Sequence, residues 1–189
     1  IFIAGAGVQW LRDKIKFIKK AADTEKIVRS LSSNNGIYLV PAFTGLGAPY
    51  WNVNARGLLS GLTRDTGPKE IVRATIESVA YQTYDLFEAM KNDGLRPKLI
   101  KVDGGMVKNN WFSQFLSDII NTKVQRPKVD ETTALGAAFM AGLQIGVYKS
   151  LKDISKNWQV DKSFNPKIKS HTRKKLLEGW SNAIRKTLS

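Results

Sequence analysis

Residues 99–111 read Leu-Ile-Lys-Val-Asp-Gly-Gly-Met-Val-Lys-Asn-Asn-Trp. An apolar run from Leu99 to Val102 ends in Asp103, Gly104 and Gly105. Apolar side chains then recur at one-turn spacing between residues 111 and 120, which predicts a helix. The stretch therefore predicts a strand, a Gly-Gly turn, a polar loop and a helix start.

Such a junction is a candidate ligand site. Glycine lets a ligand lie directly against backbone, and the unpaired N–H groups at a helix start favour phosphate. Asp103 is the carboxylate placed where ligands bind at the ends of strands in α/β sheets. The alternatives are an ordinary strand-to-helix turn and an aspartate that caps it.

On both sides of this junction, predicted strands alternate with predicted helices, which indicates a layered α/β fold. Strands are expected at residues 37–43, 57–62 and 123–126, and helices at residues 8–18, 24–31, 68–90, 134–142 and 174–188. Pro41 limits the first strand or places it at an edge. Thr132 and Thr133 are expected to cap the helix that follows. The many small residues of that helix predict a close neighbour.

Two further segments are candidate binding elements. Gly5 precedes the first predicted helix and Gln9 lies in its first turn, which makes a second potential anion site, although small residues at a helix start are common. Residues 44–51, Thr-Gly-Leu-Gly-Ala-Pro-Tyr-Trp, combine glycine, proline and aromatic side chains. We interpret them as a binding or interdomain loop.

Composition limits the class of protein. The 189 residues are enough for one domain with a real core, and the absence of cysteine excludes disulfides and thiolate metal sites. A reducing, cytoplasmic compartment fits this composition. No apolar run approaches the roughly 20 residues of a membrane span, so none is predicted. The chain lacks an initiating Met and a basic leader, and we expect it to be cut from a longer protein.

The net charge of +14 has two explanations, a surface that binds polyanions or solvated helix faces rich in lysine. No nucleic-acid motif accompanies the charge and the aromatic residues fall on apolar helix faces, so no nucleic-acid partner is predicted. The sequence contains one histidine, His171 in a basic loop, and no Walker motif. The chain therefore looks like a binding half of an enzyme, with no catalytic residue and no metal site of its own.

Several motifs, in order along nearly the whole chain, resemble the FGGY carbohydrate kinases. They are residues 43–51 (FTGLGAPYW), 56–57 (RG), 60–64 (SGLTR), 73–78 (RATIES), 80–83 (AYQT), 102–105 (VDGG), 109–110 (NN) and 133–138 (TALGAA). The aromatic loop at residues 48–51 is similar to that of the glycerol kinases within this family.

The resemblance implies an actin-like, ribonuclease-H-type fold of two domains with ATP in the cleft between them. Residues 1–189 then correspond to the C-terminal, ATP-binding domain, without the N-terminal substrate domain. Gly5 and Gln9 resemble nucleotide-contacting residues, Gly105 the glycine against which adenosine packs, and Asn109 the polar residue at the helix start. Asp103 and Gly104 are weaker candidates. The family's catalytic and glycerol-binding residues lie in the N-terminal domain.

The implied activity is phosphorylation of glycerol to sn-glycerol 3-phosphate with ATP and Mg²⁺, which this fragment does not catalyse alone. ATP or ADP and glycerol are the expected ligands, and the parent protein is expected to be a homo-oligomer. The alternatives are another FGGY sugar kinase, such as a xylulokinase-like enzyme, and a basic non-enzymatic domain that binds polyanions or nucleic acid. In a truncated chain, an apolar face that normally meets the other domain is expected near residues 44–51.

Overall fold

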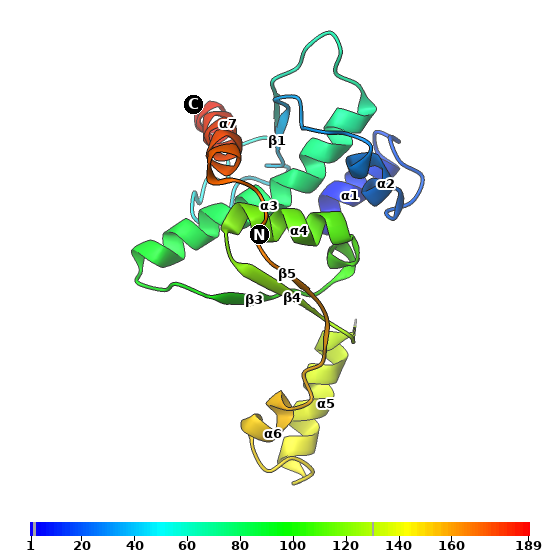
Figure 1. Cartoon of the computed structure of the whole chain (residues 1–189), viewed down its shortest axis with the longest axis vertical. Helices are drawn as coiled ribbons and strands as arrows, with labels where there is room; N and C mark the ends of the chain where they lie inside the picture. The colour runs from blue at the N-terminus through cyan, green and yellow to red at the C-terminus, as the bar shows by residue number, and fades with distance from the viewer. Residues whose placement is uncertain (2, 130) are drawn as a thin grey trace.

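The computed structural model describes residues 1, 3–129 and 131–189. Helices and strands alternate along the chain (Figure 1). The elements are α1 (Gly5–Asp13), α2 (Asp23–Arg29), β1 (Tyr38–Val40), β2 (Leu58–Ser60), α3 (Pro68–Asn92), β3 (Leu99–Lys101), the short 3-10 helix η1 (Gly105–Lys108), α4 (Asn110–Ile120), β4 (Lys123–Pro127), α5 (Thr132–Gln144), α6 (Leu151–Ser155), β5 (Val160–Phe164) and α7 (Ser170–Leu188). Of the described helices, none is both long enough and apolar enough to cross a membrane.

The strands form two small sheets. β1 and β2 pair antiparallel, and β1 ends immediately before Pro41, which shortens the strand expected at residues 37–43. In the second sheet β3 pairs parallel with β4, in register from Leu99 opposite Lys123, and β4 pairs antiparallel with β5. The parallel β3–α4–β4 unit contains the Gly-Gly junction, so the predicted α/β class is confirmed.

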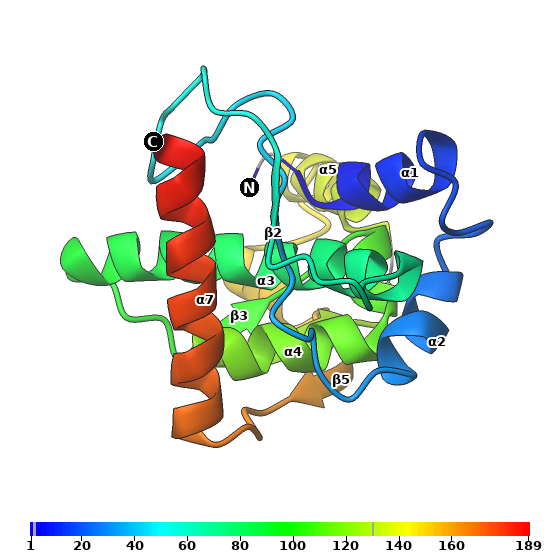
Figure 2. The same ribbon diagram turned by 90° about the horizontal axis from the view of Figure 1, so that it is seen from above.

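The long helix α3 forms the centre of the molecule. Pro68 occupies a first-turn position, where the missing N–H costs nothing, and the Glu70 carboxylate accepts the Gly67 N–H at 3.0 Å. In Figure 2, α3 and α4 lie side by side and α7 crosses them. The apolar side chains between these helices and β1 make one continuous core.

The C-terminal helix, which the sequence predicts at residues 174–188, packs one face against this core. α7 begins at Ser170, which places His171 in its first turn, where a loop was expected. Trp180 is only 1% exposed and stacks on Tyr81 of α3 at 5.3 Å. A Cβ atom at Gly179 would overlap the Tyr38 ring, so glycine lets α7 lie against β1.

A stripe of buried and half-buried polar side chains runs along α3 at four-residue intervals. Arg73 pairs with Glu77 at 2.7 Å, Tyr81 donates to Glu77 at 3.1 Å, and Asp85 accepts from the indole N–H of Trp180 at 2.8 Å. The apolar pattern of the sequence predicts only that α3 packs in the core. The structure adds a buried ion pair on this helix, so the stability of the fold depends on the charges of Arg73 and Glu77.

Helix α5 and the short α6 project away from the rest of the molecule (Figure 1). Most residues of α5 are exposed, and only Gly142, under the Tyr148 ring, is buried, so the described residues supply a close neighbour at Gly142, and one along the rest of the helix stays a prediction. The N-cap is Glu131, with no side-chain capping bond, and not the expected threonines. Thr132 instead donates its hydroxyl to the carboxylate of Asp103.

Candidate functional site

One cavity of about 560 Å³ brings together residues from three separate parts of the chain. It lies between α1, the segment leading into α2, and the turn from β3 into η1 and α4. The six site candidates of the sequence all line it: Gly5, Gln9, Asp103, Gly104, Gly105 and Asn109. The structure therefore joins the two anion sites that the sequence indicated separately.

The two glycines of the junction play different roles. Gly104 has φ +99°, a conformation that side chains disfavour, and so it makes the turn out of β3. Gly105 opens η1, where a polar loop was expected, and a Cβ atom there would meet no other atom within 4 Å. Gly5, the first residue of α1, is equally open. The cavity thus presents bare backbone on two sides.

The start of α4 is not free to bind phosphate, which corrects the expectation from the sequence. Asn109 is the N-cap, and its side-chain oxygen accepts the Phe112 N–H at 2.9 Å. The carboxylate of Glu25, from α2, accepts the Asn110 N–H at 3.3 Å. Because side chains already satisfy these donors, a ligand gains little from the dipole of this helix.

The start of α1 differs in this respect. Its N-cap residue, Ala4, has no side chain that can accept a hydrogen bond, and no acidic residue lies in the first turn. Gly7 donates its N–H to the Ala4 carbonyl at 3.0 Å, so the character of an anion site at this helix start rests on the N–H groups of Gly5 and Ala6. Gln9, one turn further along, lines the same cavity and is exposed.

Asp103 is held by local hydrogen bonds. Its Oδ1 accepts the Gly104 N–H at 2.6 Å and its Oδ2 accepts the Thr132 hydroxyl. These bonds fix the turn and attach the start of α5 to it. This geometry matches the alternative that the sequence left open, an aspartate that caps the turn.

The sequence analysis missed the wall of the cavity formed by the segment before α2 and by α2 itself. Ala21, Ala22, Thr24 and Glu25 line the cavity there. The Asn109 amide donates to the Thr24 hydroxyl at 3.4 Å, which joins α2 to the start of α4. Thr24, a polar residue at a predicted helix start, was the only signal in the sequence.

The charges around the cavity nearly balance. Arg12 and Lys108 lie against it, and so do the carboxylates of Glu25 and Asp103. Burial raises the pKa of Glu25, but its ion pair with Arg29 and the Asn110 N–H outweigh burial, so the pKa lies below the ordinary value. The +14 charge of the chain is therefore not concentrated at this site.

The donor set does not fit a resident metal ion. Across residues 1, 3–129 and 131–189 no group of three histidine, cysteine, aspartate or glutamate side chains could hold one. Mg²⁺ usually keeps several waters and binds through one or two carboxylates plus substrate phosphates. A magnesium ion at this cavity would therefore arrive with the phosphates of a ligand.

Comparison with known proteins shows the family of this chain. A sequence model described as "FGGY family of carbohydrate kinases, C-terminal domain" matches residues 1–145. The chain belongs to the FGGY carbohydrate kinase family. Glycerol kinase 1 of Pseudomonas aeruginosa is 55% identical over all 189 residues, and a glycerol kinase of Clostridium botulinum is 50% identical.

Solved structures agree with this assignment. The crystal structure of Plasmodium falciparum glycerol kinase with ADP matches 98% of this chain with a TM-score of 0.88 and 38% identity. A ligand-bound xylulose kinase from Lactobacillus acidophilus matches 98% of it with a TM-score of 0.84 and 27% identity. The expected fold, the C-terminal part of an actin-like sugar kinase, is confirmed. The chain spans 38% of the Pseudomonas relative and 37% of the Plasmodium chain.

Proposed function

We propose that this chain is the ATP-binding C-terminal domain of a glycerol kinase, which phosphorylates glycerol to sn-glycerol 3-phosphate. The observation that carries the proposal is the convergence of Gly5, Gln9, Gly105 and Asn109 on one cavity in a chain of this family. The family resemblance implies that these four residues contact the nucleotide. The cavity gives them a common surface of sufficient size.

In this proposal the adenosine packs against the open backbone at Gly105, and the phosphates lie toward the uncapped start of α1 at Gly5. Gln9 supplies a polar contact from α1, and Asn109 mainly holds the start of α4 in place. Mg²⁺ enters with ATP as part of the substrate. The chain's own contribution is positioning, which phosphoryl transfer requires more than covalent help.

We also propose that residues 1–189 act as one domain of a longer kinase whose other domain supplies the glycerol site and the catalytic base. The surface that meets the rest of the kinase lies on and beside α5. There Met140 is 51% exposed, Val147 66% and Ile145 77%. A surface of this kind is unusual for an isolated domain and typical of an interface.

This surface differs from the one expected near residues 44–51. Trp51 is 73% exposed there, whereas Gly45 and Leu46 are buried, so the loop is partly core and partly exposed, and an apolar interface at residues 44–51 stays a prediction. Homo-oligomerisation of the parent protein and a cytoplasmic location remain predictions.

Neither alternative function has a specific observation in its favour. The relatives from Pseudomonas aeruginosa and Clostridium botulinum, which are 55% and 50% identical to this chain, are both named glycerol kinase. The xylulose kinase structure shares only 27% identity with it. The balanced charges at the cavity do not favour a general polyanion site.

Calorimetric titration of the chain with Mg-ATP, Mg-GTP and Mg-pyrophosphate at two salt concentrations tests the proposal. We expect binding that prefers Mg-ATP and persists at the higher salt concentration. Equal, salt-sensitive binding of all three would indicate a response to charge alone and would overturn it. Comparing the full-length kinase on glycerol and D-xylulose tests the substrate, and preference for xylulose would overturn that part.

A further inference from the structure

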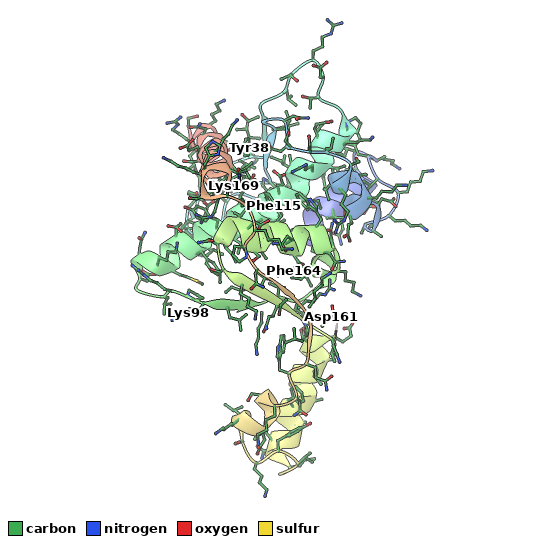
Figure 3. The ribbon with its side chains drawn as sticks, viewed as in Figure 1. Tyr38, Lys98, Phe115, Asp161, Phe164 and Lys169 are labelled. Atoms are coloured by element: carbon green, nitrogen blue, oxygen red, sulfur yellow. The ribbon has the colours of Figure 1, made fainter. Side chains whose placement is uncertain are left out.

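A second cavity, of about 490 Å³, lies on the other side of the start of α4. Its walls come from α2 and the segment that follows it, from α3 and α4, from β5, and from the start of α7. Figure 3 shows the part of this region where Phe115 of α4 and Phe164 of β5, both lining residues, lie on adjacent elements. It shares no lining residue with the cavity around Gly5, Gln9 and Gly105, which is called the nucleotide cavity below.

Buried polar side chains build the floor of this second cavity. Asn34, Arg73 and Asp118 line it and are 5%, 8% and 6% exposed. Asp118 accepts from the Gln114 amide at 3.0 Å and from the Lys167 N–H at 2.6 Å, so donors already surround its negative charge. Polar groups this deeply buried are held in fixed positions, which a binding site requires and a surface groove lacks.

Cationic side chains outnumber carboxylates in the lining of the cavity. Arg29, Arg73, Lys162 and Lys167 line it, against the single carboxylate of Asp118. Arg29 pairs with Glu25 and Arg73 with Glu77, but neither lysine has a carboxylate partner in the described part of the chain. The Lys162 ammonium lies 5.5 Å from the centre of the Phe164 ring. Two lysines without a carboxylate partner among the described residues therefore border this cavity.

The other lining groups indicate the size and kind of ligand. The hydroxyl groups of Ser32, Ser163 and Thr172 add donors, whereas the Ser33 hydroxyl already donates to Asn35 at 2.6 Å. The Trp111 ring already packs against Phe115 at 5.0 Å and against the Arg73 guanidinium at 5.0 Å. It offers no free platform for a nucleobase, so a compact ligand fits better than a nucleotide.

We propose that this cavity binds a small phosphorylated metabolite, with its phosphate group between Lys162 and Lys167. The two ammonium groups neutralise the phosphate, and the surrounding hydroxyls donate hydrogen bonds to its oxygens. The site is separate from the nucleotide cavity and does not depend on the function proposed for that cavity.

Calorimetric titration with magnesium-free pyrophosphate as the probe tests this site. We expect the double variant Lys162→Ala, Lys167→Ala to bind pyrophosphate at least about tenfold more weakly than the wild type, because two charge-assisted contacts are lost. Both side chains are exposed, so the variant should fold, which thermal unfolding checks. Its affinity for Mg-ATP should stay within about twofold of the wild type, because neither lysine lines the nucleotide cavity.

Lys169→Ala is the matched control, since Lys169 is an exposed lysine two residues further on that does not line the cavity. It should leave pyrophosphate binding unchanged. Unchanged pyrophosphate binding in the folded double variant would overturn the proposal. An equal loss in Lys169→Ala would overturn it too, because the probe would then report only the overall charge of the chain.

Discussion

Replacement of Gly105 by valine tests the nucleotide cavity most directly, because the structure predicts a loss of binding without a loss of folding. The backbone of Gly105 does not have the positive φ that side chains disfavour, and a Cβ atom there meets nothing within 4 Å. Gly105 is also exposed, at the start of a four-residue 3-10 helix. We expect Gly105→Val to change the free energy of unfolding by less than about 1 kcal/mol.

The loss of ATP affinity follows from the space that valine occupies. Its three additional carbon atoms lie where the adenosine would rest on bare backbone, and carbon atoms cannot approach closer than about 3.5 Å. Each displaced atom pair loses about 0.1–0.2 kcal/mol, so about ten lost pairs cost 1–2 kcal/mol. We therefore expect Mg-ATP to bind at least about tenfold more weakly, or about 1.4 kcal/mol.

Calorimetric titration of Mg-ATP into the wild type, Gly105→Ala and Gly105→Val measures this effect. Alanine adds one carbon instead of three and should give a smaller loss. Gly136→Val is the control, because Gly136 is equally open but lies on α5 outside the cavity. A folded Gly105→Val variant that binds Mg-ATP as tightly as the wild type would refute the placement of adenosine at Gly105.

Two further predictions concern the buried polar stripe of α3. Burial raises the pKa of Asp85 from 3.8 to about 6, although Trp180 and Tyr50 donate hydrogen bonds to it. The folded state therefore favours the protonated carboxyl group. This contribution to the free energy of unfolding is complete below pH 4 and is lost as the pH rises through 6. In urea unfolding, the free energy of unfolding of the wild type should fall by about 2–3 kcal/mol relative to that of Asp85→Asn between pH 4 and pH 8. Equal pH dependence of the two proteins would contradict this. Arg73→Met leaves the carboxylate of Glu77 buried without its ion pair and should cost about 3 kcal/mol or more. Because burial raises the pKa of Glu77, the cost should be larger at pH 8 than at pH 5, and an equal cost at both would argue against a charged, unpaired Glu77.

Local patterns in the sequence predicted the central elements well. The four-and-three spacing of apolar residues and Pro68 located α3, and the Gly-Gly turn located the junction between β3 and α4. These features depend on neighbouring residues, because helix periodicity, proline and glycine act over one or two turns of chain. The site candidates could be named for the same reason, since they stand at the start of a predicted helix or in the turn that leads to one.

Contacts between distant residues decided what the sequence left open. Glu25 caps α4 from 85 residues away, which removed the anion site expected there. β5 has a weak apolar pattern, Val-Asp-Lys-Ser-Phe, and is a strand because β4 supplies its hydrogen-bond partners. Sequence periodicity carries no signal for such a partner.

The two terminal helices show the same division. The sequence determined that α5 and α7 are helices, and the tertiary structure decided which of them is buried. α7 is polar on average, yet its Trp180 reaches Asp85 and the core because Gly179 allows close approach to β1. α5 is apolar on average, yet among its residues that the structure describes only Gly142 is buried, under the Tyr148 ring. An apolar pattern determines which face of a helix avoids water, but a second surface must be present before that face is buried.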